Sequence, residues 1–413
     1  MNQYETAAIK SEFTSAGYNT IPFSSYTEIC IINSCCVTDK SEKQSMQAAR
    51  KAKRINPNCI TLLCGCVSEK NKDKFIEADI VTGNKKTGLP KLVTSFINEK
   101  KQQIYFTDNN EQNFHGLDFG DKTRAFVKIE DGCENYCAYC IIPHVRGAIR
   151  SKKADDIINE MLYLINKGYK EIVLTGIHIT SYGRDFENNY LLIDLLEEIS
   201  QKSMPKRLRL GSLEPGYLTQ DIIPRLKKIK GLCPHFHISL QSGSDNILKS
   251  MNRKYNVYDY KKETDLLREY FENCAITTDI IIGFPGESDN DFTQTLETVK
   301  LIGFTKVHIF PFSKRDGTAA YLMENQIDKK NKENRCEILK IATDTIREEI
   351  LNGYIDTISS VLIEKNTGDN IFEGFCENYI KIYTESDKNI EKQIVRVKIK
   401  KIYKDGLLGE IIL

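Results

Sequence analysis

Three closely spaced cysteines are the feature that most constrains this chain. Cys133, Cys137 and Cys140 stand at the spacing C-x3-C-x2-C, directly after the strand-like run 124–129. Thiolates are soft ligands, and three on one tight loop can converge on an iron–sulfur cluster. A four-iron cluster with three protein ligands keeps one iron open, as a reactive metal site requires. A zinc knuckle with His144 as fourth ligand and a disulfide are the alternatives, but the spacing favours the open cluster.

The residues around this loop resemble a known family. Tyr139, placed before the last cysteine, is typical of the radical S-adenosylmethionine (AdoMet) signature, and segment 141–151 resembles the methylthiotransferase branch of that superfamily. The resemblance implies that Cys133, Cys137 and Cys140 are catalytic and that AdoMet binds the open iron through its amino and carboxylate groups. Reductive cleavage of AdoMet then yields a 5′-deoxyadenosyl radical, so the cofactor supplies the chemistry and the protein positions it.

Length and composition set the class of protein. With 413 residues the chain is expected to hold two or three domains. No apolar run reaches about 18 residues and no signal pattern opens the chain, so we expect no membrane span and a cytoplasmic location. The 13 cysteines, grouped in short spacings, favour metal binding over disulfides. Because the net charge is only +1, a nucleic-acid partner has to be held by local basic patches.

Residues 1–105 read as an α/β domain with a parallel sheet. Strands are expected at 28–33, 59–63 and 78–82, and a helix from about Thr38, with Thr38 and Asp39 as cap candidates. The first two strands end on cysteine-bearing loops, where ligand sites gather in parallel sheets. Free cysteine also packs as a small hydrophobe, so the residues alone leave both readings open.

The family resemblance extends to these loops. Segments 33–35 and 64–66 resemble the N-T-C and T-G-C motifs of a domain that carries a second 4Fe-4S cluster, which implies Cys35 and Cys66 as ligands. The resemblance leaves the other cysteines of this region as bystanders: Cys30, Cys36, Cys59 and Cys64.

One ligand of that second cluster is missing. In the family it precedes a segment that matches 2–6, and no cysteine stands before that segment here. We therefore expect that the reading frame starts late and that the domain lacks its first strand. The alternative is that Cys36 or Cys64 substitutes as the third ligand.

Residues 121–345 alternate strands and helices, after a polar linker at 101–120. Six expected strands fit the partial (β/α)6 barrel of radical AdoMet enzymes, whose sites lie at the carboxyl ends of the strands. The resemblance places AdoMet against motifs at these ends, although turns and helix caps would use the same residue types. The implied contacts are Tyr139, Thr175, Gly176, Glu214, Gln241 and Gly283.

Two other features of this region have simpler interpretations. His235 and His237 share one strand face, and we expect them to be satisfied core residues. A basic cluster beyond the cysteine loop is interpreted as solvated surface, with phosphate contact as the alternative. Its members are Arg146, Arg150, Lys152 and Lys153.

The C-terminal part, 353–413, follows a long polar helix at about 329–352 and is expected to form a small antiparallel β-barrel. Segment 373–379 resembles the TRAM domain, an OB-like RNA-binding module. A basic stripe is its expected backbone contact: Arg396, Lys398, Lys400, Lys401 and Lys404.

The resemblance covers essentially the whole chain and implies a specific activity. Segment 174–183 resembles a stretch of the enzymes that modify threonylcarbamoyladenosine in tRNA. The implied reaction is methylthiolation at C2 of N6-threonylcarbamoyladenosine next to the anticodon, with two 4Fe-4S clusters and AdoMet as cofactors. The implied partners are the tRNA anticodon stem-loop and an electron donor such as flavodoxin or ferredoxin. The alternatives are methylthiolation of isopentenyladenosine and an RNA-binding iron–sulfur protein without transferase activity.

Overall fold

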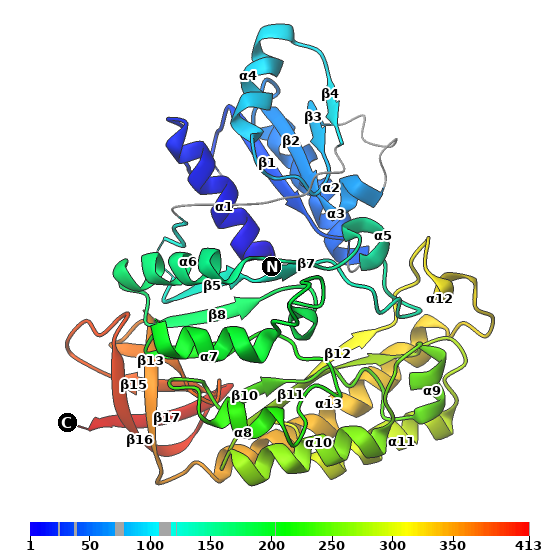
Figure 1. Ribbon diagram of the computed structural model, residues 1–413, viewed down its shortest axis with the longest axis vertical. Helices are drawn as coiled ribbons and strands as arrows, with labels where there is room; N and C mark the ends of the chain where they lie inside the picture. The colour runs from blue at the N-terminus through cyan, green and yellow to red at the C-terminus, as the bar shows by residue number, and fades with distance from the viewer. Residues whose placement is uncertain are drawn as a thin grey trace.

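The computed structural model describes residues 1–23, 25–36, 39–70, 78–106, 117–120, 122–202 and 204–412. Thr38 and most of the predicted linker, 107–116, lie outside these ranges. Figure 1 shows an N-terminal α/β part stacked on a central barrel, with a small β-barrel beside the central one. None of the described helices is both long and apolar enough to cross a bilayer.

The N-terminal part is a parallel sheet, as predicted. Its strands lie in the order β1 (Ile29–Ser34), β2 (Ile60–Gly65), β3 (Ile80–Thr82) and β4 (Gln103–Tyr105). The short β4 was not predicted, because it falls within the polar segment interpreted as a linker. Its helices are α1 (Asn2–Ser15), α2 (Asp39–Ile55), α3 (Cys66–Lys70) and α4 (Leu89–Glu99).

Both faces of this sheet are covered, which explains why β2 reads as a continuous apolar run. Leu62 and Cys64 pack with α1 and α4 on one face, whereas Leu63 packs with α2 on the other. The strand ends at Gly65 and Cys66 already begins α3, so Cys66 leaves the alternation of β2 and packs on the face opposite to Cys64.

The central part is a partial barrel of two three-stranded parallel sheets. The strands are β5 (Arg124–Lys128), β8 (Glu171–Thr175), β9 (Arg207–Leu210), β10 (His235–His237), β11 (Ala275–Ile282) and β12 (Lys306–Pro311). Bridges from Leu208 to Leu232 and from Leu213 to Ile238 connect the two sheets. Among the described strands β5 and β12 do not pair with each other, so the barrel stays open on that side, as predicted for a (β/α)6 barrel.

Helices cover the outside of this barrel (Figure 1). They are α6 (Ala154–Asn166), α7 (Leu192–Lys202), α8 (Ile222–Lys227), α9 (Asp245–Ser250), α10 (Val257–Tyr270), α11 (Asp289–Ile302) and α13 (Lys329–Asn352). Side-chain caps mark the starts of α10 and α11: Asn256 accepts a bond from the Asp259 N–H, and Ser288 and Asp291 form a capping box. The loops of the central part contain further short elements: β6 (Glu130–Asp131), α5 (Ile142–Arg146), β7 (Arg150–Ser151), η1 (Ile179–Ser181) and α12 (Ala319–Leu322).

The C-terminal part is a closed five-strand barrel in the order β13-β14-β15-β17-β16. The strands are β13 (Ile358–Asn366), β14 (Ile371–Cys376), β15 (Lys381–Glu385), β16 (Ile394–Tyr403) and β17 (Gly406–Ile412). The small barrel is confirmed, and one pair departs from the predicted antiparallel pattern, because β15 and β17 are parallel. Strand directions cannot alternate all the way round a ring with an odd number of strands, so one parallel pair is unavoidable.

A buried arginine fastens this barrel to the central one. Arg207 of β9 is 1% exposed and donates to the backbone oxygens of Ser360 at 2.7 Å and Phe375 at 2.9 Å. Bonds from a charged group are stronger than neutral ones, by roughly a factor of two. The C-terminal part is therefore held in a defined position.

Candidate functional site

The C-x3-C-x2-C loop lies between β6 and α5 at the carboxyl end of the central strands. Its backbone is anchored at both ends, since Cys133 N–H donates to Gly147 O at 3.1 Å and Ala138 N–H donates to Met251 O at 2.9 Å. A Cβ on Gly132 would meet Ala148 O at 2.0 Å, so the entry to the loop requires glycine. The loop is therefore a fixed scaffold.

The three thiols of the loop fit a cluster better than the alternatives. All three are free and half-buried. Burial is the main cause that raises the pKa of Cys133 to about 11 and that of Cys140 to about 12. A single zinc ion would need ligand atoms that lie close together. Among the described residues, no set of three drawn from these thiols and His144 has its ligand atoms within 4.8 Å of one another. Wider spacing suits a cluster in which each thiolate binds a separate iron corner.

An arginine that sequence reasoning missed joins this loop to Glu214. Arg253, just after α9, donates from Nη1 to the Cys137 Sγ at 3.1 Å and from Nη2 to the Glu214 Oε1 at 2.8 Å. The Asn135 side chain also donates to that oxygen at 3.3 Å. Burial raises the pKa of Glu214, and Arg253 opposes this shift. The predicted Glu214 thus lies beside the cysteines, whereas no sequence motif marked Arg253.

The other predicted cofactor contacts have structural roles of their own. Thr175, at the end of β8, accepts a hydrogen bond from the Met1 amino group at 3.3 Å. A Cβ on Gly176 would meet Glu130 Oε2 at 2.7 Å, and one on Gly283 would meet the Lys332 side chain at 2.1 Å. Close packing therefore favours glycine at position 176, and the φ of +73° favours it at position 283.

Two further predicted contacts lie on loops near the strand ends. Gln241 adopts a φ of +66°, and its backbone bonds with β11 on both sides. Tyr139 packs against an apolar cluster that contains Phe284 and Phe312. Backbone pairing therefore fixes Gln241, and apolar packing fixes Tyr139.

The second cysteine set lies at the ends of β1 and β2. Cys35 is half-exposed, and Cys66, at the start of α3, is buried. The Cys36 thiol, expected to be a bystander, adjoins the Cys66 sulfur, and the interaction between the two thiols is the main cause that lowers the pKa of Cys66. Cys64 instead packs on the opposite sheet face and donates to Ile32 O at 3.5 Å. Of the two proposed substitutes, only Cys36 adjoins Cys66.

The two cysteine sets border one apolar cluster. Cys36 and Cys66 pack there with Ile141, Ile142 and Val145 of the segment after the loop, and Cys133 and Cys140 lie against the same cluster. Two sites that can each hold an iron–sulfur cluster therefore lie next to each other, with buried apolar side chains between them.

A buried charge network locks this arrangement. Arg146 of α5 lies 2.9 Å from Glu5 of α1 and 3.0 Å from Asp131 of β6. Lys86 pairs with Glu5, and Lys128 pairs with Asp131 at 3.1 Å. The network joins the N-terminal part to the central barrel at the place where the two cysteine sets meet.

Comparison with known proteins decides the family. The radical SAM superfamily profile matches residues 127–299, and the profile described as uncharacterized protein family UPF0004 matches residues 1–83. The threonylcarbamoyladenosine tRNA methylthiotransferase MtaB of Bacillus subtilis is 34% identical over 97% of this chain and 92% of its own length. The chain belongs to the radical AdoMet methylthiotransferase family.

Other relatives of this methylthiotransferase carry a different substrate in their names. A tRNA-2-methylthio-N(6)-dimethylallyladenosine synthase of Clostridium tetani is 35% identical over 99% of this chain and 94% of its own length. Among solved structures, the radical AdoMet methyltransferase TsrM of Kitasatospora setae matches with a TM-score of 0.58 at 11% identity, covering 89% of this chain and 76% of TsrM. That likeness confirms the fold alone.

This radical AdoMet transferase uses AdoMet and two 4Fe-4S clusters, the cofactors of its family. The donor sets fit them: three thiols on an anchored loop suit the AdoMet cluster, and Cys35 and Cys66, with Cys36 beside them, suit the second. Soft sulfur ligands in a mostly apolar surrounding are what such clusters need.

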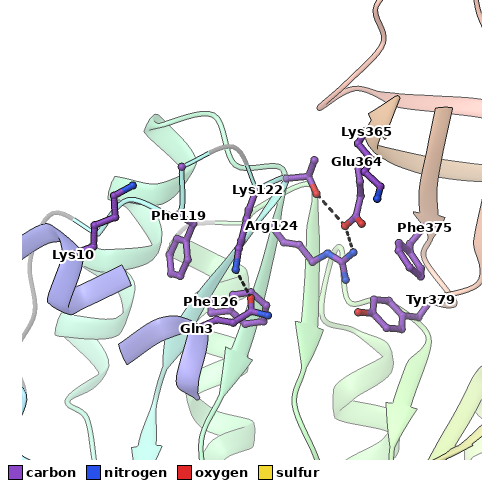
Figure 2. Close-up of a pocket in the computed structure, with 12 residues that line it drawn as sticks. Gln3, Lys10, Phe119, Lys122, Arg124, Phe126, Glu364, Lys365, Phe375 and Tyr379 are labelled. Atoms are coloured by element: carbon purple, nitrogen blue, oxygen red, sulfur yellow. Dashed lines mark hydrogen bonds and ion pairs between the residues drawn. The ribbon is translucent and has the colours of Figure 1, made fainter. Parts of the chain in front are cut away.

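A surface groove of about 750 Å³ separates α1, the start of β5 and the C-terminal barrel of this methylthiotransferase (Figure 2). We call it the lysine groove. Phe375 and Tyr379 stack at 4.8 Å, and Arg124 lies 5.0 and 4.9 Å from their ring centres. The groove is lined by Gln3, Lys10, Phe119, Gly120, Lys122, Thr123, Arg124, Phe126, Glu364, Lys365, Phe375 and Tyr379.

Proposed function

We propose that this enzyme transfers a methylthio group to C2 of N6-threonylcarbamoyladenosine next to the anticodon of tRNA. The observation that carries the proposal is the pair of cysteine sets bordering one apolar cluster, since the reaction needs a radical source and a sulfur source at one substrate atom. Full-length similarity to enzymes named for this substrate supports the choice of adenosine.

The two cysteine sets have different roles in this proposal. Cys133, Cys137 and Cys140 hold the cluster that binds AdoMet, with Glu214 and the strand-end residues around the cofactor. Cys35 and Cys66 hold the second cluster. When bound and reduced by a flavodoxin or ferredoxin, the cluster on Cys133, Cys137 and Cys140 together with AdoMet would supply the radical chemistry that the reaction needs at C2. Burial of the boundary between the sets excludes water, which protects a reactive species from side reactions.

The chain divides into three functional parts in this proposal. Residues 1–105 carry the sulfur-donating cluster, 121–345 form the radical AdoMet domain, and 353–413 form a TRAM-like RNA-binding domain. In that last part, the predicted basic stripe is partly neutralised, since Lys400 pairs with Glu410 at 2.9 Å and Lys398 lies 3.9 Å from Asp356.

The lysine groove is a second candidate for RNA contact, and of its lysines Lys365 also pairs with a carboxylate, Glu373, at 3.3 Å. It combines ammonium groups from Lys10, Lys122 and Lys365 with exposed ring surface, the pairing that binds single-stranded nucleic acid. Its lysines come from all three parts of the chain, so a bound RNA would span them (Figure 2).

One experiment separates the candidate functions. The enzyme is reconstituted anaerobically with iron and sulfide, then given AdoMet, a reductant and anticodon stem-loop RNA carrying either threonylcarbamoyladenosine or dimethylallyladenosine. Mass spectrometry of the nucleosides is expected to find the methylthio product of the first RNA. Product from the second RNA alone would establish the dimethylallyl activity instead, which the similar relative from Clostridium tetani makes the second candidate. No product and no 5′-deoxyadenosine would favour a non-catalytic RNA-binding protein.

Replacing Cys66 with alanine is expected to abolish methylthiolation and to spare reductive AdoMet cleavage. Only the sulfur-donating cluster loses a ligand, because Cys66 lies in the N-terminal part and not on the AdoMet loop. Iron content and 5′-deoxyadenosine are measured beside the RNA product. Cys64→Ala is the matched control, since its thiol faces the opposite side of the sheet. Equal loss of both activities in a folded Cys66→Ala protein would contradict the assignment.

Removing the groove lysines is expected to weaken RNA binding and its dependence on salt. Each phosphate that a lysine no longer neutralises lowers the slope of log affinity against log salt by about 1, so the triple change Lys10→Gln, Lys122→Gln and Lys365→Gln lowers it by about 2 to 3. Fluorescence anisotropy at several salt concentrations measures the slope. A control triple changes exposed lysines on outer helices: Lys249, Lys300 and Lys340. An equal change in slope for both triples would exclude the groove as the RNA-binding surface.

A further inference from the structure

The central barrel encloses a cavity of about 220 Å³ that none of the proposed roles uses. Its upper end reaches Val173 and Ser212, each two residues before a proposed AdoMet contact, Thr175 and Glu214. Residues two apart along an extended chain share a face. The cavity therefore extends from near the proposed AdoMet contacts toward the amino-terminal ends of β5, β10 and β12, and it shares Arg124, Phe126 and Tyr379 with the lysine groove.

The lining of this cavity is strongly cationic. It carries four arginine or lysine side chains and three histidines, and no carboxylate among the described residues: Arg124, Arg209, Lys306, Arg347, His235, His237 and His308. Glu171 pairs with Arg209 at 3.0 Å and Glu364 pairs with Arg124, whereas Lys306 forms no ion pair within 4.0 Å with any described residue. A low-dielectric cavity lined by one sign of charge favours a ligand of the opposite sign.

A buried atom without a partner also indicates a ligand. His235 is 7% exposed, and its Nδ1 atom has no hydrogen-bond partner among the described residues, while its Nε2 atom lies 3.3 Å from Thr277 Oγ1. The expectation of a satisfied core histidine was therefore wrong at this atom. A buried polar atom left unpaired costs about 1–3 kcal/mol, so a bound group that pairs with it is favoured.

The neighbouring group of His237, Asp279 and His308 admits a metal reading. Their ligand atoms lie within 4.8 Å of one another, and His237 Nε2 is 3.2 Å from Asp279 Oδ2. Two imidazoles and a carboxylate can hold a divalent cation. The four permanently cationic side chains of the lining oppose a further positive charge, and the contact of His237 with Asp279 is an ordinary hydrogen bond. The charge balance favours an anionic ligand.

We propose that this cavity receives the N6 substituent of the substrate adenosine and binds its carboxylate through Lys306, His308 and Arg347. The inference rests on the proposed function and names what selects its substrate. A threonylcarbamoyl group ends in a carboxylate and a hydroxyl, whereas a dimethylallyl group is pure hydrocarbon. The volume is below the roughly 300 Å³ of a small-molecule pocket, so it suits one substituent and not a whole nucleoside.

The physical cost of the wrong substrate explains the selection. A hydrocarbon in this cavity would take water from Lys306 and the histidines and offer no partner in return. A site that forms hydrogen bonds with a polar group of its substrate rejects an analogue that lacks this group by about 10⁴- to 10⁵-fold. Burial lowers the pKa of Lys306 and of His308. Nearby cations add to both shifts, whereas Asp405 opposes the shift of Lys306 and Asp279 opposes that of His308.

The test uses the full-length enzyme with both clusters reconstituted and three stem-loop RNAs. They carry threonylcarbamoyladenosine, its methyl ester, or dimethylallyladenosine. The wild-type enzyme is expected to have the highest kcat/KM for the free carboxylate. Lys306→Met and His308→Leu should each lower that value by about 10- to 100-fold, the worth of a charged hydrogen bond, and leave the value for the ester unchanged. Lys300→Met on α11 is the matched control.

The outcomes separate this inference from the proposed function. Product from dimethylallyladenosine alone overturns the proposed substrate. Product from threonylcarbamoyladenosine with equal kcat/KM for acid and ester overturns the inference and leaves the proposed function standing. Equal losses on acid and ester in the variants also overturn it, as does a stoichiometric zinc or manganese ion that His308→Leu removes. Thermal unfolding and 5′-deoxyadenosine formation without RNA check folding, and Arg347→Met on α13 replaces any variant that fails this check.

Discussion

Cys137→Ala is expected to abolish reductive cleavage of AdoMet. Cys137 is the middle one of the three proposed ligands on an anchored loop, and its sulfur accepts a bond from Arg253 at 3.1 Å. Without it the cluster keeps two thiolates, and the iron that binds AdoMet is no longer held in place. Loss of groups that merely support a metal ligand costs up to about 100-fold, so loss of a ligand itself should exceed that. The measurement is 5′-deoxyadenosine formed per reconstituted enzyme.

Controls show whether the effect belongs to the cluster. Cys336→Ala removes a half-buried thiol from α13 and should leave iron content and cleavage unchanged. Arg253→Met should keep the cysteines but weaken their orientation and that of Glu214, giving a partial loss. Wild-type cleavage by a folded Cys137→Ala protein would show that the loop is not the radical site.

Local patterns explain what could be predicted well from the sequence. The cysteine loop, the six central strands and helix α13 depend on spacing and periodicity within a few residues, and all appear near the expected positions. The missed strands β4 and β14 lack such a signal. β14 reads Ile-Phe-Glu-Gly-Phe-Cys, and its glycine is required because a Cβ on Gly374 would meet Leu362 O at 2.2 Å. A glycine inside a run lowers any strand prediction.

Contacts between distant segments could not be predicted. Several features depend on how the strands pack. They are the proximity of the free thiols of Cys36 and Cys66, the contact of Arg253 with Cys137 and the unpaired His235 atom. The basic cluster after the cysteine loop shows this most clearly. The prediction of a solvated surface was wrong for Arg146, which is 6% exposed, and Lys152 pairs with Glu160. The Arg146 partner Glu5 is far away in sequence, so no local pattern reveals the pair.

Arg146→Met is expected to lower the free energy of unfolding by about 3–5 kcal/mol. The guanidinium neutralises Glu5 and Asp131, which are both almost fully buried. Removing it leaves two buried carboxylates that share only Lys86 and Lys128, and breaking a buried pair from one side leaves an uncompensated charge. Urea unfolding followed by circular dichroism measures the change. Arg225→Met is the matched control, because Arg225 bonds two carboxylates at the surface and should cost about 1 kcal/mol or less.

The pH dependence of this difference identifies its cause. Nearby cations, of which Arg146 is one of the two largest for each, hold the pKa values of Glu5 and Asp131 below their ordinary values despite burial. A lowered carboxyl pKa contributes stability above the unfolded value of about 4, and that contribution is lost as the pH falls. The stability gap between wild type and Arg146→Met should therefore be largest near neutral pH and shrink below about pH 4. Because the network sits where the two cysteine sets meet, the variant should also lose methylthiolation more than AdoMet cleavage. A gap independent of pH would assign the effect to packing of the Arg146 side chain and not to its charge.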